Sequence, residues 1–354
     1  MAEYGRGTTG AGWGETGNEA ARMTAFSAPP RTYLFAILLA GLLLGLSGCS
    51  PTPREPVRIG LNPWPGYDFL YLAARKGWIA EAGGHVEIVE FTSLGDSRRA
   101  FERGQVDAFG GTTVELLLVR QNSDRRPRAF YVTNWSEGAD QILAPPAMES
   151  VADLRGKRVG VEPASLNLLV LATALDRAGM AYDAVERVAL PQAELPAAVA
   201  GDRIDAAVSY PPVANTLKQR FDLRPVFDTA EAPRTVLDLL IADARALTRR
   251  PADFRAVVEA FHRAVRFAAD HPEEAYRIMG RREGLTPGKL ARVIEDIRVL
   301  DLPDQAGLWA ADGAVARTLA RTGAILHTAG HLPGPPETNG LTAPAIVRAA
   351  EAGG

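Results

Sequence analysis

The chain has 354 residues, of which 47% are hydrophobic and 23% are charged, and its formal net charge is -3 at pH 7. This composition is typical of a folded globular chain and excludes a predominantly disordered one. Nucleic acid is not expected as a partner, because its binding surfaces need clustered Lys and Arg. The arginines here form short pairs, which we interpret as solvated helix faces: Arg98-Arg99, Arg125-Arg126, Arg249-Arg250 and Arg281-Arg282.

Residues 1–49 have the pattern of a lipoprotein signal peptide. An apolar run over residues 33–46 follows Arg31 and leads through small residues to Cys49, the only cysteine. A secretory leader has a positive flank, an apolar core of roughly 7 to 15 residues and a small-residue cleavage site, whereas a bilayer span needs ~20 apolar residues. We therefore predict cleavage before Cys49 and lipidation of its thiol.

Lipidation of Cys49 anchors the protein to a membrane at the periplasmic or extracytoplasmic face of the cell envelope. It also removes the only thiol, which excludes disulfides and cysteine-based metal or catalytic sites. The alternative is an N-terminal membrane anchor with an incidental cysteine. Translation from Met1 or from Met23 leads to the same mature chain.

The remaining part of about 300 residues is long enough for two domains. An internal repeat supports two lobes. Residues 57–61 (VRIGL) are echoed by residues 157–161 (KRVGV), and a Val-Asp-Ala at Asp107 is echoed by an Ile-Asp-Ala at Asp205. Both motifs recur at nearly the same domain-sized spacing, which favours two similar units in tandem. We interpret both aspartates as structural turn residues.

Each unit alternates strands and helices, which predicts a mainly parallel sheet covered on both faces. Asp96 and Ser165 are candidate N-caps of the second helix of unit one and the first helix of unit two. In the first unit, strands are predicted at 57–61, 86–91 and 106–109, and helices at 67–81 and 96–104. In the second unit, strands are predicted at 158–161, 185–190 and 204–209, and helices at 165–178 and 194–200.

Extended segments are predicted to cross between the lobes, and helices to follow them. The crossing segments are residues 130–133, 139–144 and 236–242, and helices are expected from residue 251 to about 327. The predicted boundaries are a linker at 50–55, lobe 1 at 56–138 and 239–330, lobe 2 at 139–238, and a C-terminal tail at 331–354.

Four short motifs occur in the chain: IGLNPWPGY at 59–67, LAARKGW at 72–78, GQVDA at 104–108 and DLRGKRVGV at 153–161. Together they resemble the nitrate/sulfonate/taurine-type solute-binding proteins of ABC importers. The resemblance implies an α/β fold of the type II periplasmic binding protein class, with two lobes and a ligand cleft between them. It further implies a monomer that hands a small solute to a permease and its ATPase.

In open α/β sheets, ligands bind beyond the carboxyl ends of the strands, so the residues after each strand are the candidate site. Ser165, Asp96 and Thr112 have a purely structural alternative as helix caps, and Trp64 and Tyr67 as loop packing. The candidate ligand-binding residues are Asn62, Trp64, Tyr67, Ser93, Gly111, Thr112, Thr113, Ser136, Asp140, Glu162, Ser165, Tyr210 and Asp238.

Two ligand classes fit these residues. Glycines, threonines and helix N-termini suit an anion such as nitrate or a sulfonate, for which Arg98 and Arg99 are the nearest counter-charges. Alternatively, Glu137, Asp140 and Glu162 among aromatic rings suit a cation or an amino-pyrimidine, because carboxylates accept hydrogen bonds from N–H donors.

An enzymatic function has little support in the sequence. The chain contains no cysteine nucleophile after processing, no Gly-x-Ser-x-Gly elbow, no phosphate loop and no His-Glu-x-x-His motif. His327 and His331 have the spacing of a helical metal pair, but neighbouring Gly330 and Pro333 favour a helix end. We predict no catalytic site, no metal and no cofactor, and keep a sensor or accessory receptor as an alternative to transport.

Overall fold

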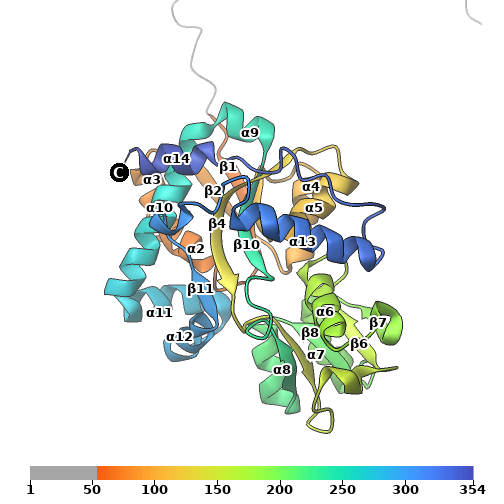
Figure 1. The fold of residues 1–354 in the computed structure, drawn as a ribbon. Coiled ribbons are helices and arrows are strands. Elements are labelled where there is room, and N and C mark those ends of the chain that lie inside the picture. The colour runs from red at the N-terminus through yellow and green to blue at the C-terminus, as the bar shows by residue number, and fades with distance from the viewer. Residues whose placement is uncertain (1–53, 354) are drawn as a thin grey trace, which may run out of the picture. The chain divides into compact units, whose positions relative to one another are not determined.

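Two mixed β-sheets organise residues 54–353, the part of the chain that this computed structural model describes (Figure 1). The predicted signal peptide and Cys49 lie outside the described residues. None of the described helices is both long enough and apolar enough to cross a membrane. The α/β fold with two lobes agrees with the prediction.

The first lobe contains a six-stranded sheet with the order β11-β4-β10-β3-β1-β2. Strand β1 is parallel to β2 and β3, and β10 is antiparallel to β3 and β4. The strands are β1 (Val57–Leu61), β2 (Val86–Glu90), β3 (Ala108–Thr112), β4 (Pro127–Ser136), β10 (Leu237–Asp243) and β11 (Ile297–Val299). Its helices are α2 (Asp68–Arg75), α3 (Trp78–Glu81), α4 (Leu94–Glu102), α5 (Thr113–Asn122), α9 (Ala244–Arg249), α10 (Pro251–Asp270), α11 (Pro272–Glu283), α12 (Pro287–Glu295), α13 (Ala314–Thr328) and α14 (Ala345–Glu351).

The second lobe contains a five-stranded sheet with the order β7-β6-β8-β5-β9. Strand β6 is parallel to β7 and β8, and β5 is antiparallel to β8 and β9. The strands are β5 (Gln141–Ala144), β6 (Arg158–Val161), β7 (Glu186–Ala189), β8 (Ala206–Ser209) and β9 (Arg224–Asp228), and the helices are α6 (Leu166–Arg177), α7 (Leu195–Ala200) and α8 (Val213–Phe221).

The two lobes repeat one arrangement, as the sequence echo predicts. In both, the first strand lies between the second and third, and an antiparallel strand follows. Asp107 and Asp205 have the same structural role, since each carboxylate accepts a hydrogen bond from the first strand's backbone, at Arg58 (3.0 Å) and Arg158 (2.8 Å). The interpretation of both aspartates as structural residues is confirmed.

Two helix predictions in the first lobe were wrong in detail. The single helix predicted at 67–81 is broken into α2 and α3 at Gly77, whose φ of 78° is a left-handed conformation that stops the helix and that glycine adopts without strain. Asp96 is not an N-cap, because α4 begins two residues earlier, at Leu94. Ser93 caps α4 by accepting from the backbone N–H of Asp96.

The interpretation of the arginine pairs as solvated is wrong for Arg98 and Arg282. Arg98 is buried on α4, where it pairs with Glu102 one turn away. The Arg282 side chain is 2% exposed and pairs with Asp68 at the start of α2. The partner of Arg98 lies one helical turn away on the same helix, and the partner of Arg282 lies on a different helix. The presence of two adjacent arginines in the sequence does not reveal either partner.

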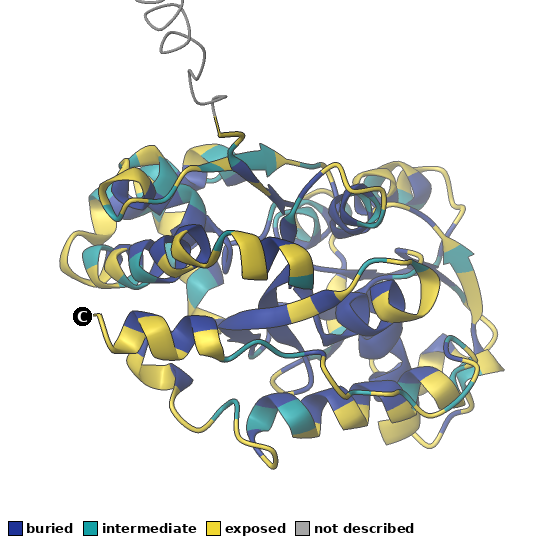
Figure 2. Ribbon diagram, turned by 90° about the horizontal axis from the view of Figure 1, so that it is seen from above, coloured by how far each residue is buried: buried dark blue, intermediate teal, exposed yellow. Residues whose placement is uncertain are grey.

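Buried residues fill the central strands and inner helix faces of both lobes, whereas the edge strands β2, β7 and β9 and the outer helix faces include exposed residues (Figure 2). Helix α13 contacts α5 of the first lobe and α6 of the second, so it bridges the lobes on one side (Figure 1). Helix α14 packs on α10, and Thr342 bridges to Ala129 of β4. The described part of the C-terminal tail is therefore packed on the body of the protein.

Candidate ligand site

The loops after β1, β2, β6 and β8 meet where the two lobes face each other. The rings of Trp64, after β1, and Tyr210, after β8, lie edge to face with centroids 6.0 Å apart. The Glu162 carboxylate, after β6, accepts from the backbone N–H of Gly95 (3.1 Å) and from the Tyr210 hydroxyl (3.2 Å). Trp64 and Gly95 belong to the first lobe, and Glu162 and Tyr210 to the second. The structure therefore shows the lobes in a closed arrangement.

Three buried carboxylates lie beside this junction, and we call Glu115, Asp140 and Asp238 the acid cluster. Asp238 lies on β10 between Thr112 of β3 and Asn134 of β4 and accepts from the Tyr67 hydroxyl (2.8 Å). Glu115 lies in the first turn of α5, and Asp140 in the crossover before β5. All three are at most 2% exposed.

The acid cluster has acceptor atoms that no described residue satisfies. Both oxygens of Asp140, Oε1 of Glu115 and Oδ2 of Asp238 are buried without a hydrogen-bond partner, as are Oδ1 of Asn62 and Oδ1 of Asn134. The unsatisfied donors nearby are the indole N–H of Trp64 and Nε of Arg98, whose charge acts on Glu115. Buried polar groups are normally paired, and leaving one unpaired costs about 1–3 kcal/mol. The orphaned set has mostly acceptors, which suits a ligand rich in N–H donors.

Burial and mutual repulsion set the protonation of the acid cluster. Burial raises the pKa of Asp140 to about 7, and the charge of Glu115 adds to the rise. Burial first, and the charge of Asp140 second, hold the pKa of Asp238 well above its usual range. Burial also raises the pKa of Glu115, against hydrogen bonds from Thr112. No lysine or arginine forms a salt bridge with these three side chains in the described part of the chain.

Thr112, Thr113 and Gly111 are engaged within the protein. Thr112 caps α5, and Glu115 completes the capping box by accepting from the Thr112 backbone (2.8 Å) and hydroxyl (2.6 Å). The Thr113 hydroxyl lies 2.9 Å from that of Thr322 on α13. A Cβ at Gly111 would lie 2.6 Å from the Phe109 ring, so this glycine permits side-chain packing.

The candidates at the crossover tie its two strands together. The Ser136 hydroxyl lies 2.8 Å from that of Thr229 and accepts from the backbone N–H of Asp140 (3.1 Å). Thr229 also accepts from the backbone of Gly138 (2.8 Å). Ser136 therefore holds the crossover, and its hydroxyl lies close enough to the Asp140 carboxyl to lower its pKa against the larger effect of burial. Glu137 is half-buried, and its backbone donates to the Asp296 carbonyl (2.9 Å).

Ser165 and Ser93 both cap helices, and their hydroxyls are only secondary candidates for a ligand. Ser165 accepts from the backbone N–H of Asn167 and donates to the Glu162 carbonyl (3.1 Å). Asn62 donates to the Pro63 carbonyl (3.0 Å), and only its oxygen lacks a partner.

A buried ion cluster supports the loop that carries Trp64 and Tyr67. Arg282 donates to Asp68 (2.5 Å) and to the backbone carbonyl of Asn62 (2.9 Å). Burial raises the pKa of the neighbouring Glu283, and the charge of Asp68 adds to the rise, while a hydrogen bond from the Trp64 backbone opposes it. The end of α11 thus positions both aromatic residues from outside the site.

Two cavities lie at the lobe boundary, and the first is lined by Ala139 and Gln141, on either side of Asp140. One, of about 210 Å³, is lined by Gln141 and Lys218 of the second lobe and Arg292 and Asp296 of the first. The other, of about 410 Å³, is mostly apolar and lies between α5, the end of β6 and His331. The side chains of the acid cluster line neither cavity, because closed lobes leave little open volume around the orphaned polar atoms.

Sequence reasoning missed Glu115 and Asn134. Glu115 follows Thr112 at the spacing of a capping box, a signal that predicts a glutamate in the first turn of a helix but not its burial. Asn134 has no such signal, since its place beside Asp238 depends on the register between β4 and β10.

The geometry defines a class: a two-lobed α/β protein with a buried polar site between the lobes, which is the periplasmic binding protein fold. Solved structures agree. The alkanesulfonate-binding protein SsuA of Xanthomonas axonopodis pv. citri, bound to MOPS, is 21% identical with a TM-score of 0.66, covering 82% of this chain and 98% of that one. The Escherichia coli aliphatic sulphonate-binding SsuA is 17% identical with the same TM-score, covering 82% and 92%. The desulfurization enzyme DszB shares the fold, at 19% identity and a TM-score of 0.59, covering 84% and 99%.

The particular family follows from the sequence itself: residues 64–275 match the family described as NMT1/THI5 like, and the chain belongs to it. A Brucella abortus protein, named only as a binding protein, is 28% identical over 190 residues, 53% of this chain and 57% of the relative. The formylaminopyrimidine-binding protein of Halalkalibacterium halodurans is 27% identical over 183 residues, 49% of this chain and 54% of the relative. The matches span little more than half the length of these relatives.

Proposed function

We propose that the protein is the extracytoplasmic solute-binding component of an ABC importer, and that its solute presents N–H donors or a positively charged nitrogen. The two-lobed fold and the family support the first part. The unsatisfied carboxylate oxygens of the acid cluster carry the second part.

The charges at the site favour this ligand class over nitrate, sulfonates or taurine. An anion placed against Asp140 and Asp238 would oppose the ionisation of carboxyls whose pKa burial already raises, whereas a cation or an N–H donor would favour their ionised forms. Arg98, the nearest arginine expected from the sequence, is paired with Glu102. Amine or amidine N–H groups would satisfy the free oxygens and remove their desolvation cost.

Aromatic side chains complete the site. Trp64, Tyr67 and Tyr210 are buried beside the acids, and aromatic faces attract cations and stack on flat rings. An amino-pyrimidine combines a flat ring with N–H donors, and one relative is named for a formylated amino-pyrimidine. We therefore place amino-pyrimidines first and other nitrogen bases second.

Capture follows from lobe closure. The ligand contacts both lobes only when they are closed, so its binding shifts the population toward the closed state that a permease recognises. A lipid on Cys49 would keep the monomer at the membrane beside its permease.

A binding screen on the chain without residues 1–49 tests the proposal. The ligands are amino-pyrimidines, primary and quaternary amines, taurine, ethanesulfonate and nitrate. Binding is measured first by thermal shift and then by calorimetry. We expect saturable stabilisation by amino-pyrimidines or amines only. Saturable binding of ethanesulfonate or nitrate with no response to nitrogen bases would overturn the ligand class.

A further inference from the structure

Among the four buried acids described at the lobe junction, Glu162 is the one whose two side-chain oxygens are both satisfied. Oε1 accepts from the Gly95 backbone (3.1 Å) and Oε2 from Tyr210 (3.2 Å), and the residue is 2% exposed. Gly95 is on the first lobe, and Tyr210 is on the second. The carboxylate therefore bridges the junction, whereas the acid cluster remains available to a ligand.

The atoms that hold Glu162 are those of an anion site. Gly95 is the second residue of α4, a nine-residue helix that follows β2, and Ser93 is its N-cap. Free N–H groups and the helix dipole make such a helix start favourable for a negative charge. Hydrogen bonds from Gly95, Ser93 and Tyr210 lower the pKa of Glu162, against the larger effect of burial, which raises it. Burial remains the larger effect, so the pKa of Glu162 is raised overall.

The fit at this point is close. A Cβ added at Gly95 would lie 3.1 Å from Oε1 of Glu162, so the carboxylate lies directly against the backbone of α4. A ligand anion cannot reach the Gly95 N–H unless Glu162 leaves.

We propose that the Glu162 carboxyl group is a built-in occupant of the start of α4: it covers the backbone N–H of Gly95, excludes anionic solutes from it, and latches the two lobes together. The exclusion explains in physical terms why this chain would reject the anions for which the sulfonate-binding neighbours are named. The exclusion of anions by Glu162 rests on the proposed function and narrows its ligand class. The role of Glu162 in holding the lobes together does not depend on which ligand binds.

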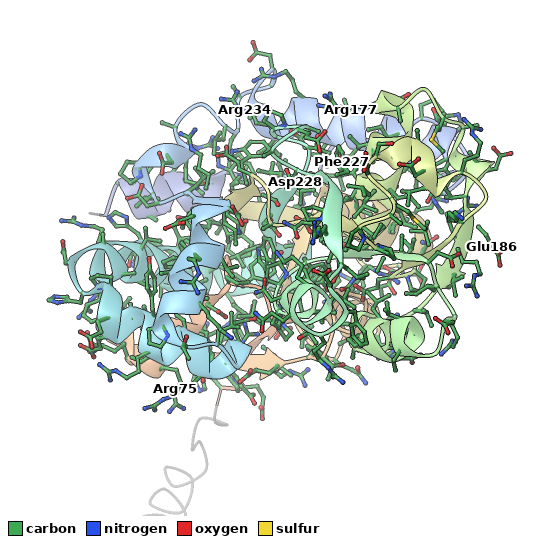
Figure 3. The ribbon with its side chains drawn as sticks, turned by 90° about the horizontal axis from the view of Figure 1, so that it is seen from below. Arg75, Arg177, Glu186, Phe227, Asp228 and Arg234 are labelled. Atoms are coloured by element: carbon green, nitrogen blue, oxygen red, sulfur yellow. The ribbon has the colours of Figure 1, made fainter. Side chains whose placement is uncertain are left out.

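Three variants separate the effects of volume and charge. Glu162→Ala empties the subsite, Glu162→Gln fills it without charge, and Glu186→Ala removes an exposed carboxylate of the same lobe as a control (Figure 3). The probe is ethanesulfonate at millimolar concentration, read by thermal shift and calorimetry. We expect Glu162→Ala to bind it at least about tenfold more tightly than the parent, and the other two variants to behave like the parent. No gain in Glu162→Ala, or equal binding by the parent, would refute the exclusion.

The latch has its own readout, without ligand. Small-angle scattering reports the mean separation of the lobes, and Glu162→Ala should increase the radius of gyration above that of the parent. Gly95→Ala should do the same, because it crowds the carboxylate from the other side without changing any charge. An unchanged radius in both variants would refute the latch. These measurements use no nitrogen base. The test of the latch can therefore succeed or fail whatever the result of the amino-pyrimidine screen.

Discussion

Replacing Asp140 by asparagine should change how the stability of the protein depends on pH. The pKa of Asp140 is raised from 3.8 to about 7 in the fully buried state. An acid whose folded pKa lies above its unfolded pKa is stabilising when protonated, so its contribution is lost as pH rises from about 4 to about 7. Each tenfold change in proton affinity is worth about 1.4 kcal/mol, so between pH 5 and pH 8 the loss is about 3 kcal/mol.

The amide in the Asp140→Asn variant cannot ionise, so the variant lacks this loss. The amide also has unpaired groups that cost about 1–3 kcal/mol, but this cost is the same at both pH values. Relative to the parent, the variant should therefore gain about 3 kcal/mol of unfolding free energy on going from pH 5 to pH 8, or on the order of 5–10 °C in Tm.

Calorimetric melts without ligand at pH 5, 6, 7 and 8 measure this difference. Asp124→Asn is the matched control, because Asp124 is exposed, and it should follow the parent at every pH. A constant difference between the Asp140→Asn variant and the parent over this range would show that Asp140 is ionised normally and that the reasoning about its burial is wrong.

Four further outcomes are expected. Trp64→Ala and Tyr210→Ala should each weaken ligand binding by roughly 1–3 kcal/mol, measured by calorimetry, and unchanged affinity in both would remove these rings from the site. Arg282→Met should lower the unfolding free energy, measured in urea, by about 3–5 kcal/mol, because it leaves buried acids without their cation. Arg281 is exposed, so Arg281→Met should change the unfolding free energy by less than about 0.5 kcal/mol. Equal effects of the two substitutions would contradict the buried ion cluster. Gly77→Ala should cost roughly 1–2 kcal/mol through its left-handed backbone alone, since no atom lies within 4 Å of the added Cβ, and a neutral effect in the same urea titration would mean that the helix break can relax. Affinity for a cationic solute should rise with pH between 5 and 7 as the acid cluster deprotonates, and calorimetry showing tighter binding at pH 5 would exclude a cation.

Local patterns predicted much of the fold. Strands β1 and β6 have the predicted bounds, because short β-branched runs between turn residues leave little choice of register or length. Ser165 and Thr112 cap helices as the structural alternative predicted, since capping depends only on residues within one turn.

Contacts between distant segments were not predictable in the same way. The bounds of α4 were displaced because Ser93 and Asp96 are both good caps and only the structure distinguishes them. The sequence predicts solvated side chains for Arg98 and Arg282 because the burial of an arginine depends on the partner that it meets, and the sequence does not show that partner.

The sequence by itself determined the tandem α/β units, the motifs of the family and which residues follow each strand, because these are properties of neighbouring positions. The same residues fit two opposite ligand classes, anions and nitrogen bases, and the sequence alone does not distinguish between them. Only the tertiary structure decided which acids are paired. Glu162 meets the backbone of Gly95 across the lobe junction, while Asp140 and Asp238 retain free oxygens. The charge that a site offers depends on which of its groups are already satisfied, and that is decided when segments far apart in the chain are brought together.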